Sequence, residues 1–277
     1  KDSLASIFLE TTFDVLIDIS GHTKKDVEYV LEHCAKKIGH HIFISSSTVY
    51  ASPVSYRVSE NSPKIQGLNT AAKQKIDAEN VLVSYGQRHN LHFTILRPHG
   101  VFGRFDPCQS GQMLYRLHSG LPIIGRGSQS ARLNPVYVED VVTAIVVAIS
   151  NTMSYGKAYN VAGDIEFTLR EFFALCESVS GRTGFLNYSP NESEFYQHGV
   201  DFKRHAGPIT DWTPFDFVCS NTRIKADLGV TFTPPEFALQ QTHLWLQRNP
   251  KRLNYFRFQG ERSILTQSNI SRLSRIQ

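Results

Sequence analysis

Four hydroxyl side chains stand together at residues 45–48, in the stretch FISSSTVYAS over residues 43–52. They end the segment HHIFISSS, whose apolar residues are typical of a strand buried on both faces. A hydroxyl at the end of such a strand could orient a substrate oxygen. It could equally serve only to satisfy backbone groups where the strand stops. The residue types alone leave both alternatives open.

Two lysines, Lys73 and Lys75, follow in the stretch AAKQKIDAENVLVSYGQRH. Its apolar residues recur at helical spacing, which predicts a helix over residues 71–89. An ammonium group on this helix could act beside the hydroxyls, because a positive charge favours the ionised form of a neighbouring acid. The simpler alternative is a lysine that faces solvent.

The elements that must position these groups alternate along the chain. Strands are expected at 13–20, 40–47 and 91–98, and helices at 24–38 and 71–89. This order is typical of an α/β fold with a doubly wound parallel sheet, in which sites lie beyond the carboxyl ends of the strands. Three polar or Gly-bearing segments follow such strand ends, which predicts one pocket; they are SGHT, SSST and RPHGVFG.

Beyond residue 103 the pattern is looser, which favours a second, smaller unit. Helix signals there include Thr168 as an N-cap with Glu171 three residues later and Gly181 as a stop. The stretches SNTRIKADLG and PEFALQQTHLWLQRN are also expected to be helices. We expect a partial Rossmann-like core over 1–165 and a mixed α/β substrate lobe over 166–250, to which 104–135 contributes. Residues 251–277 are expected to form a basic C-terminal extension.

Composition favours a soluble globular protein: the chain has 277 residues and a net charge of +4. Residues 251–277 contain six Lys or Arg and one Glu, so this tail carries +5 and the rest of the chain −1. Four scattered cysteines without metal-like spacing predict free thiols in a reducing compartment and no metal site. The cytosol, the mitochondrial matrix and the chloroplast stroma remain alternatives.

Ordered motifs across residues 13–247 resemble the extended short-chain dehydrogenase/reductase superfamily, in its nucleotide-sugar epimerase/dehydratase branch. The chain is most similar to atypical members of that branch, which include chloroplast stem-loop RNA-binding proteins. The resemblance implies a Rossmann-like fold and NAD or NADP as cofactor. It rests on the stretches FDVLIDIS, FISSSTVYAS, SENSP, TILRPHGVFG, VYVEDVVTAI, AYNVAGDIEFTLREF and TRIKADLG.

The resemblance also implies a catalytic set of serine, tyrosine and lysine, in which the tyrosine precedes the lysine by one helical turn. The family register makes Ser46 the serine, and Glu79 identifies Lys75 as the lysine. The tyrosine position is then Ala71; if Lys73 were the lysine instead, it would be Asn69. Neither side chain can donate a proton as a phenol does.

Further roles follow only from the resemblance. Arg132 is expected to bind a substrate phosphate, and Lys75 to hold the ribose hydroxyls of the nicotinamide nucleotide. The expected cofactor-binding residues are Ser20, Gly21, Ser45, Lys75, Pro98, Gly100 and Val101.

The family's Gly-rich turn for the pyrophosphate is the second departure from its pattern. No GxxGxxG occurs in the sequence, and the first strand resembles the family's fourth. About 60 residues of the usual N-terminal half are therefore expected either to lie outside the sequence or to have been lost.

Two functions are consistent with these residues. The first is an NAD(P)-dependent nucleotide-sugar epimerase/dehydratase-like protein with impaired or altered redox catalysis, unless Tyr50, His99 or Cys108 replaces the tyrosine. The second is an inactive scaffold or subunit of a larger complex, with RNA binding as a minority alternative. A homodimer through the 71–88 helix is also expected from the resemblance. Dinucleotide binding with sugar turnover would favour the first, and co-purification with other subunits the second.

Overall fold

The computed structural model describes residues 11–50, 57–66, 71–106, 110–120, 123–126, 130–184, 186–188, 209–211 and 215–249. They divide into two compact units. The first, here called the sheet unit, contains the chain up to Val101 together with Asn134–Ile165 and Phe217–Thr233. The second, the lobe unit, contains Phe102–Leu133, Glu166–Asp216 and the chain from Pro234 onward.

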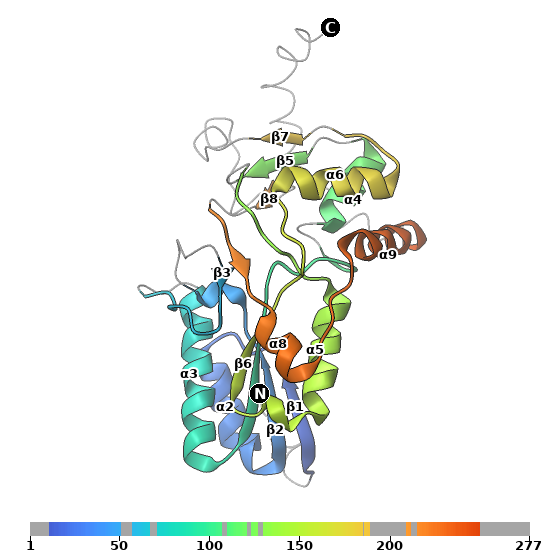
Figure 1. The fold of residues 1–277 in the computed structure, drawn as a ribbon. Coiled ribbons are helices and arrows are strands. Elements are labelled where there is room, and N and C mark those ends of the chain that lie inside the picture. The colour runs from blue at the N-terminus through green and yellow to red at the C-terminus, as the bar shows by residue number, and fades with distance from the viewer. Residues whose placement is uncertain are drawn as a thin grey trace, which may run out of the picture. The chain divides into compact units, whose positions relative to one another are not determined.

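The sheet unit is built on four parallel strands in the order β1-β2-β4-β6 (Figure 1). The four strands lie in the same order in space as along the chain, and each connection crosses over a face of the sheet, as parallel pairing requires. The doubly wound parallel fold expected from the sequence is confirmed. The strands are β1 (Phe13–Asp18), β2 (Ile38–Ile44), β4 (His92–Pro98) and β6 (Lys157–Val161).

Helices cover both faces of this sheet (Figure 1). On one face α2 (Lys24–Cys34) and α3 (Ala71–His89) pack on side chains that include Phe43. On the other face α5 (Val138–Ser150) and α8 (Thr222–Leu228) pack on side chains that include Ile42. Adjacent strand residues point to opposite faces, so β2 must be apolar on both of its sides. This burial explains the continuous apolar run in its sequence.

Two helices begin at capping boxes. Thr23 caps α2 with Asp26, and Thr168 caps α6 (Leu169–Ser180) with Glu171. In each box the threonine oxygen accepts a backbone N–H of the first turn, and the acid accepts the backbone N–H of the cap. Helix α6 ends at Gly181, which has a left-handed φ of 64°. The start and stop predicted for this helix are confirmed.

A late segment of the chain returns to the sheet unit. Strand β9 (Val218–Cys219) pairs with β3 (Arg57–Val58), and the helix that follows it, α8, packs against β6. Residues 217–233 therefore belong to the sheet unit, although the sequence placed all of 166–250 in the lobe. The reason is pairing between segments far apart in the chain, which no local pattern reports.

In the described part of the lobe unit, three helices accompany a small parallel sheet in the order β7-β5-β8. Phe172 of α6 lies edge-on to both Phe102 and Phe167 in its core. Within the described ranges, no helix combines the length and apolar character needed to cross a membrane. The remaining elements are α4 (Ser110–Ser119), α9 (Pro235–Arg248), β5 (Ile123–Arg126), β7 (Leu186–Tyr188) and β8 (Ile209–Asp211).

The described residues also form short 3-10 turns. The turn η2 (Ser47–Val49) follows β2 and carries part of the hydroxyl cluster. The turns η1 (Ala35–Lys37) and η3 (Thr152–Ser154) follow α2 and α5. Three cysteines, Cys34, Cys176 and Cys219, are buried and free, as their scattered positions predicted. Cys108 lies outside the described residues.

Candidate functional site

The hydroxyl cluster at the end of β2 divides into two anchored serines and one half-buried serine between them. Ser45 is buried and donates its Oγ hydrogen to Glu79 Oε1 at 2.6 Å. Ser47 is also buried, and its Oγ lies 2.8 Å from Nδ1 of His99. The groups that hold them come from α3 and from the segment after β4. The chain on either side of Ser46 is thereby tied to two different elements.

Ser46 has the hydrogen bonding expected of a serine that serves a ligand. Its Oγ accepts from the backbone N–H of Thr48 at 3.2 Å and from the Thr48 hydroxyl at 3.0 Å. A serine hydroxyl has one donor and two acceptor positions. Both acceptor positions are used locally, so the remaining O–H is left to donate to a substrate oxygen.

Lys75 points from α3 toward the carboxyl ends of β1 and β2. Its Nζ donates to the carbonyl of Gly21 at 2.6 Å and to that of Ile44 at 2.8 Å. Only 8% of the residue is exposed, so the solvent-facing alternative is wrong. Burial lowers the pKa of Lys75, and the nearby Asp18 and Glu79 oppose that shift. The ammonium keeps one N–H that neither carbonyl uses.

Ala71 stands at the start of α3, four residues before Lys75, and it is exposed. Residues four apart lie on one face of a helix, so a tyrosine here would share the side of α3 from which Lys75 projects. The methyl group offers neither a proton nor a hydrogen bond. Asn69, the alternative position for a tyrosine, lies outside the described residues.

Glu79 is the centre of a buried ionic cluster. In the sequence analysis it served only to identify Lys75 as the family lysine. Arg97 binds it with two hydrogen bonds, Nε to Oε1 at 2.9 Å and Nη2 to Oε2 at 2.8 Å. Lys64 donates to Oε2 at 2.7 Å. Burial alone would raise the pKa of Glu79, but Arg97 and Lys64 outweigh it and hold the pKa below its usual value. Glu79 therefore stays ionised and ties α3 to β4 and β2.

Tyr50 belongs to the same cluster and has no proton to offer a substrate. Its hydroxyl donates to Asn160 Oδ1 at 2.5 Å and accepts from Arg97 Nη1 at 2.8 Å. Burial raises the pKa of Tyr50 to about 12, against the opposing effect of Arg97. A buried phenol with this pKa is a structural hydrogen-bond partner.

His99 is also too enclosed to exchange a proton with a substrate. It is 2% exposed, its Nδ1 faces Ser47, and its ring lies edge-on to Phe217. Burial lowers the pKa of His99 to about 4, so the ring is neutral at physiological pH. Of the groups considered as replacements for the tyrosine, Tyr50 and His99 are thus enclosed, and Cys108 lies outside the described residues.

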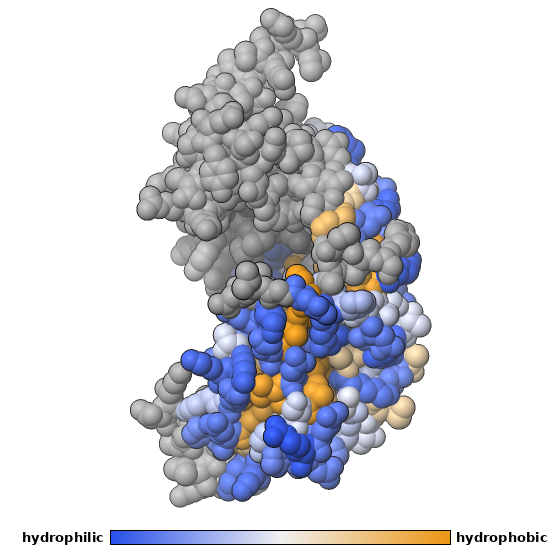
Figure 2. All heavy atoms as spheres, turned by 90° about the vertical axis from the view of Figure 1, so that its left-hand side faces the viewer, coloured by the Kyte–Doolittle hydropathy of each residue, from blue (hydrophilic) through white to orange (hydrophobic). Residues whose placement is uncertain are grey.

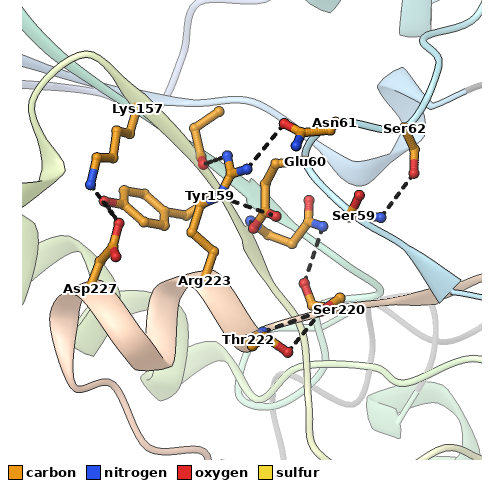
Figure 3. A network of polar contacts seen from close by, with 12 residues as sticks. Ser59, Glu60, Asn61, Ser62, Lys157, Tyr159, Ser220, Thr222, Arg223 and Asp227 are labelled. Atoms are coloured by element: carbon orange, nitrogen blue, oxygen red, sulfur yellow. Dashed lines mark hydrogen bonds and ion pairs between the residues drawn. The ribbon is translucent and has the colours of Figure 1, made fainter.

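A second polar network connects the SENSP segment to β6 and α8 (Figure 3). Glu60 accepts the backbone N–H of Asn160 at 3.0 Å, and its carboxylate lies 3.6 Å from Nε of Arg223. Arg223 also donates to Asn61 at 3.1 Å. Asn160 joins this network to Tyr50. The polar side chains behind the candidate site are therefore continuous from Glu79 to α8.

The expected cofactor contacts lie at three strand ends of the sheet unit. Ser20 is exposed and Gly21 buried after β1; Ser45 is buried after β2. After β4, Gly100 has a left-handed φ of 54° and Val101 is 39% exposed. Pro98 is the last residue of β4 and is buried.

The donors left at these strand ends decide how a nicotinamide ribose could be held here. The Lys75 ammonium has one unused N–H, enough for one ribose hydroxyl, and the Ser46 hydroxyl also keeps its donor. Ser45, in contrast, directs its hydroxyl at Glu79, which leaves its backbone for such a contact.

Arg132 lies in the lobe unit and is already paired with carboxylates. Its Nη2 lies 3.2 Å from Glu171 Oε2, and its Nε lies 3.6 Å from Glu166 Oε2. Its side chain is 34% exposed, so an anion could still approach it. A phosphate would compete with two acids for this guanidinium, and its substrate role stays a prediction.

Solved structures that share this fold include two epimerases in complex with UDP-sugars. UDP-glucuronic acid 4-epimerase from Bacillus cereus, in complex with UDP-glucuronic acid and NAD, matches with a TM-score of 0.67 and 18% identity, covering 81% of this chain and 67% of that chain. UDP-glucose 4-epimerase from Thermotoga maritima, with UDP-glucose, matches with a TM-score of 0.71 and 18% identity, covering 90% and 82%. At sequence identities this low, the structural likeness shows the shared fold alone.

Two curated relatives match by sequence. An uncharacterised UDP-glucose epimerase of Bacillus subtilis is 27% identical over 175 residues, 61% of this chain and 54% of the relative. The mitochondrial NADH dehydrogenase [ubiquinone] 1 alpha subcomplex subunit 9 of Dictyostelium discoideum is 26% identical over 187 residues, which are 64% of this chain and 49% of the relative. The chain thus spans about half the length of these relatives. The model of the NAD dependent epimerase/dehydratase family matches residues 22–162, just over half of the chain. The chain belongs to that family.

Proposed function

We propose that this chain is an NAD(P)-linked, nucleotide-sugar epimerase/dehydratase-like protein whose hydride chemistry is impaired because Ala71 occupies the position at which the family resemblance implies a tyrosine. The observation that carries the proposal is Ala71, exposed on the first turn of α3 and four residues before the buried Lys75. The rest of the local machinery is present: Ser46 has a hydroxyl proton to donate, and Lys75 has an ammonium held at the strand ends.

The missing step is proton transfer. When a sugar hydroxyl is oxidised, its carbon gives a hydride to the nicotinamide and its oxygen must lose a proton to a base. Ser46 can orient that oxygen, and Lys75 can hold the ribose and favour a nearby anion. Neither is a base near neutral pH. Loss of a positioned acid/base costs on the order of 10²–10⁴-fold in rate.

The cofactor and substrate classes follow the relatives. Similar structures contain NAD together with a UDP-sugar, and the expected contacts of this chain suit the ribose end of such a dinucleotide. A bound nicotinamide would supply the hydride acceptor. Lys75 would hold its ribose, Ser46 would face the sugar oxygen, and the backbone from Pro98 to Val101 would line the nicotinamide.

A second candidate is a subunit of a larger assembly that keeps the fold without the reaction. The relative from Dictyostelium discoideum, described as a subunit of NADH dehydrogenase, favours it. So does the continuous buried network from Glu79 to Arg223, which would hold the fold together whether or not Ser46 and Lys75 do chemistry.

The test is to restore the phenol in the full-length protein. Ala71→Tyr should raise turnover of a UDP-sugar with NAD by about 10²-fold or more. Ala72→Tyr places the same side chain one position around the helix and is the matched control. Titration with NAD, NADH, NADP and NADPH measures binding separately. Nucleotide binding with turnover only in Ala71→Tyr supports the proposal. Full turnover by the native protein contradicts it, and stable co-purification without nucleotide binding favours the second candidate.

A further inference from the structure

Asp18 is a buried carboxylate for which the proposed chemistry has no use. It is the last residue of β1 and is 6% exposed. Its Oδ1 accepts the backbone N–H of Gly21 at 2.8 Å. Its Oδ2 accepts no hydrogen bond and lies 3.7 Å from Nε2 of His41, a residue with no exposed surface. Burial of a carboxylate is costly unless the group is paired and hydrogen-bonded, and only one oxygen of Asp18 accepts a hydrogen bond.

The contact of Asp18 with Gly21 leads directly to Lys75. The same glycine that donates its N–H to Asp18 presents its carbonyl to Lys75 Nζ at 2.6 Å. A Cβ at this glycine would lie 2.6 Å from Asp18 Oδ2, so an alanine there would force the Asp18 carboxylate to shift. Asp18, Gly21 and Lys75 thus form one chain of hydrogen bonds.

Most of the hydrogen-bond donors of the Lys75 ammonium are therefore already used by protein atoms. Two of its three N–H donors go to the carbonyls of Gly21 and Ile44. The Ile44 carbonyl belongs to β2, whose backbone is fixed on both sides by β1 and β4. The Gly21 carbonyl belongs to a turn outside the sheet, in which Asp18 accepts the Gly21 N–H and Asp26 accepts the N–H groups of the next two residues. Of the two contacts, the one to Gly21 can be released without breaking the sheet.

We propose that Asp18 is a positioning residue that, through Gly21, holds the Lys75 ammonium against this carbonyl, and that a nucleotide ribose must displace the Gly21 carbonyl to bind Lys75. The inference rests on the proposed function and adds a regulated step to it. Two hydroxyls of a vicinal diol need two N–H donors, whereas the retracted ammonium offers one. Loosening of the turn therefore increases nucleotide affinity.

Reactivity of Lys75 toward an acylating reagent tests the hydrogen-bond chain without any nucleotide. Lys73, on the same helix and 36% exposed, is an internal reference in every sample. Mass spectrometry gives the rate at each site between about pH 7 and about pH 10, near the usual lysine pKa. The limiting rate reports access to the amine, and the pH midpoint reports its charge environment.

Four variants separate the contact from the charge. Asp18→Ala should raise the limiting rate of Lys75 about tenfold, the value of one charge-assisted hydrogen bond, and lower the midpoint. Gly21→Ala should raise the rate with little change of midpoint, because the carboxylate remains. Asp18→Asn should lower the midpoint and restore the native rate, because its amide oxygen still accepts from Gly21. Ile19→Ala, at a residue of the same turn that is 66% exposed, should change neither.

Titration of the same proteins with NAD distinguishes failure of this inference from failure of the proposed function. Asp18→Ala and Gly21→Ala should bind NAD about tenfold more tightly than the native protein, and NAD should protect Lys75 from acylation. Higher Lys75 reactivity without NAD binding by any variant upholds the Asp18 contact and removes the nucleotide role. NAD binding with equal Lys75 reactivity in all variants overturns the contact and leaves the proposed function standing. An equal rate increase in Asp18→Asn and Asp18→Ala also overturns it.

Discussion

The two ends of the α3 face that carries Ala71, Lys75 and Glu79 differ in how many polar contacts they make. At Glu79, deep in the helix, every carboxylate oxygen has a partner, and Arg97, Lys64 and Ser45 converge on it. At Ala71, on the exposed first turn, a methyl group stands where the family resemblance calls for a phenol. The difference separates the interactions that stabilise the fold from the group that would move a proton.

This contrast has a physical cause. Loss of one partner from a buried charge pair leaves an uncompensated charge, so the cluster at Glu79 cannot be removed piecemeal. Loss of an exposed phenol leaves a shorter side chain in water and costs little stability. A protein of this fold can therefore lose its proton donor and keep its structure.

The largest expected effect is on stability, at the buried cluster. Arg97→Met should lower the free energy of unfolding of the protein by about 3–5 kcal/mol, because Glu79 then remains charged and buried. Denaturant unfolding measures the loss. Lys73→Met breaks a surface pair with Asp77, whose partners are 36% and 37% exposed, and should cost under about 1 kcal/mol. Equal losses in the two variants would contradict the contrast.

Acid should destabilise the fold through two buried histidines. Burial lowers the pKa values of His40 and His99 to about 4, from an ordinary value of 6.5. Below pH 6.5 the unfolded chain binds protons that the folded chain does not, so stability falls as the pH drops from about 6.5 to about 4. Each histidine can contribute on the order of 3 kcal/mol across this window. Unfolding curves at several pH values measure the slope, and a flat profile between about pH 6.5 and 4.5 would count against neutral burial.

A helix cap in the lobe unit gives a smaller effect. Thr168→Ala should cost about 1 kcal/mol, because the N–H of Glu171 loses its acceptor and the capping box is broken. Thr168→Ser keeps the hydroxyl and should recover most of the loss. Chemical denaturation followed by a probe in α6 checks both variants. If serine and alanine behave alike, the cap contributes nothing.

The smallest effect on stability is expected where the chemistry is missing. Ala71→Tyr should change the free energy of unfolding by no more than about 0.5 kcal/mol, because residue 71 is exposed. Ala78→Tyr is the matched contrast on the same helix, at a position with no exposed surface, where overpacking costs roughly 1–3 kcal/mol. Thermal unfolding of the pair makes the comparison. A large loss in Ala71→Tyr would show that the first turn of α3 is packed.

Local patterns in the sequence predicted the elements well. The helix over residues 71–89 has the predicted bounds, and the Thr168 cap and Gly181 stop of α6 are where composition placed them. These features depend on residues within a few positions of each other. The return of 217–233 to the sheet unit depends on pairing between β3 and β9, which are about 160 residues apart, and local patterns carry no signal for it.

The sequence singled out the residues of the candidate site, but it did not predict their hydrogen bonds. The register that singled out Ser46, Lys75 and Ala71 came from the family resemblance. It gave no reason to expect that Ser45 and Ser47 would be anchored while Ser46 keeps its donor. The contacts of Asp18 were not predicted, since its neighbours are a backbone N–H and a histidine on the adjacent strand. A charged residue at the end of a buried apolar strand was the one available signal.

Figure 2 turns toward the viewer the side of the molecule that bears α3 in Figure 1. A groove of about 550 Å³ lies between α2 and α3 on the sheet unit, and its lining mixes apolar residues such as Leu31 and Val81 with charged ones such as Glu28 and Arg88. The family resemblance implies a homodimer through α3, and the dimer remains a prediction. Sedimentation of the native protein and of Val81→Glu would measure it.

The most direct test of the central claim is single-turnover reduction of bound NAD by a UDP-sugar, followed by the absorbance of the reduced nicotinamide. The full-length native protein and its Ala71→Tyr variant are compared at saturating NAD. The account predicts that both bind NAD and that only Ala71→Tyr reduces it at an appreciable rate. Equal, rapid reduction by the native protein would show that another group moves the proton, and would contradict the account.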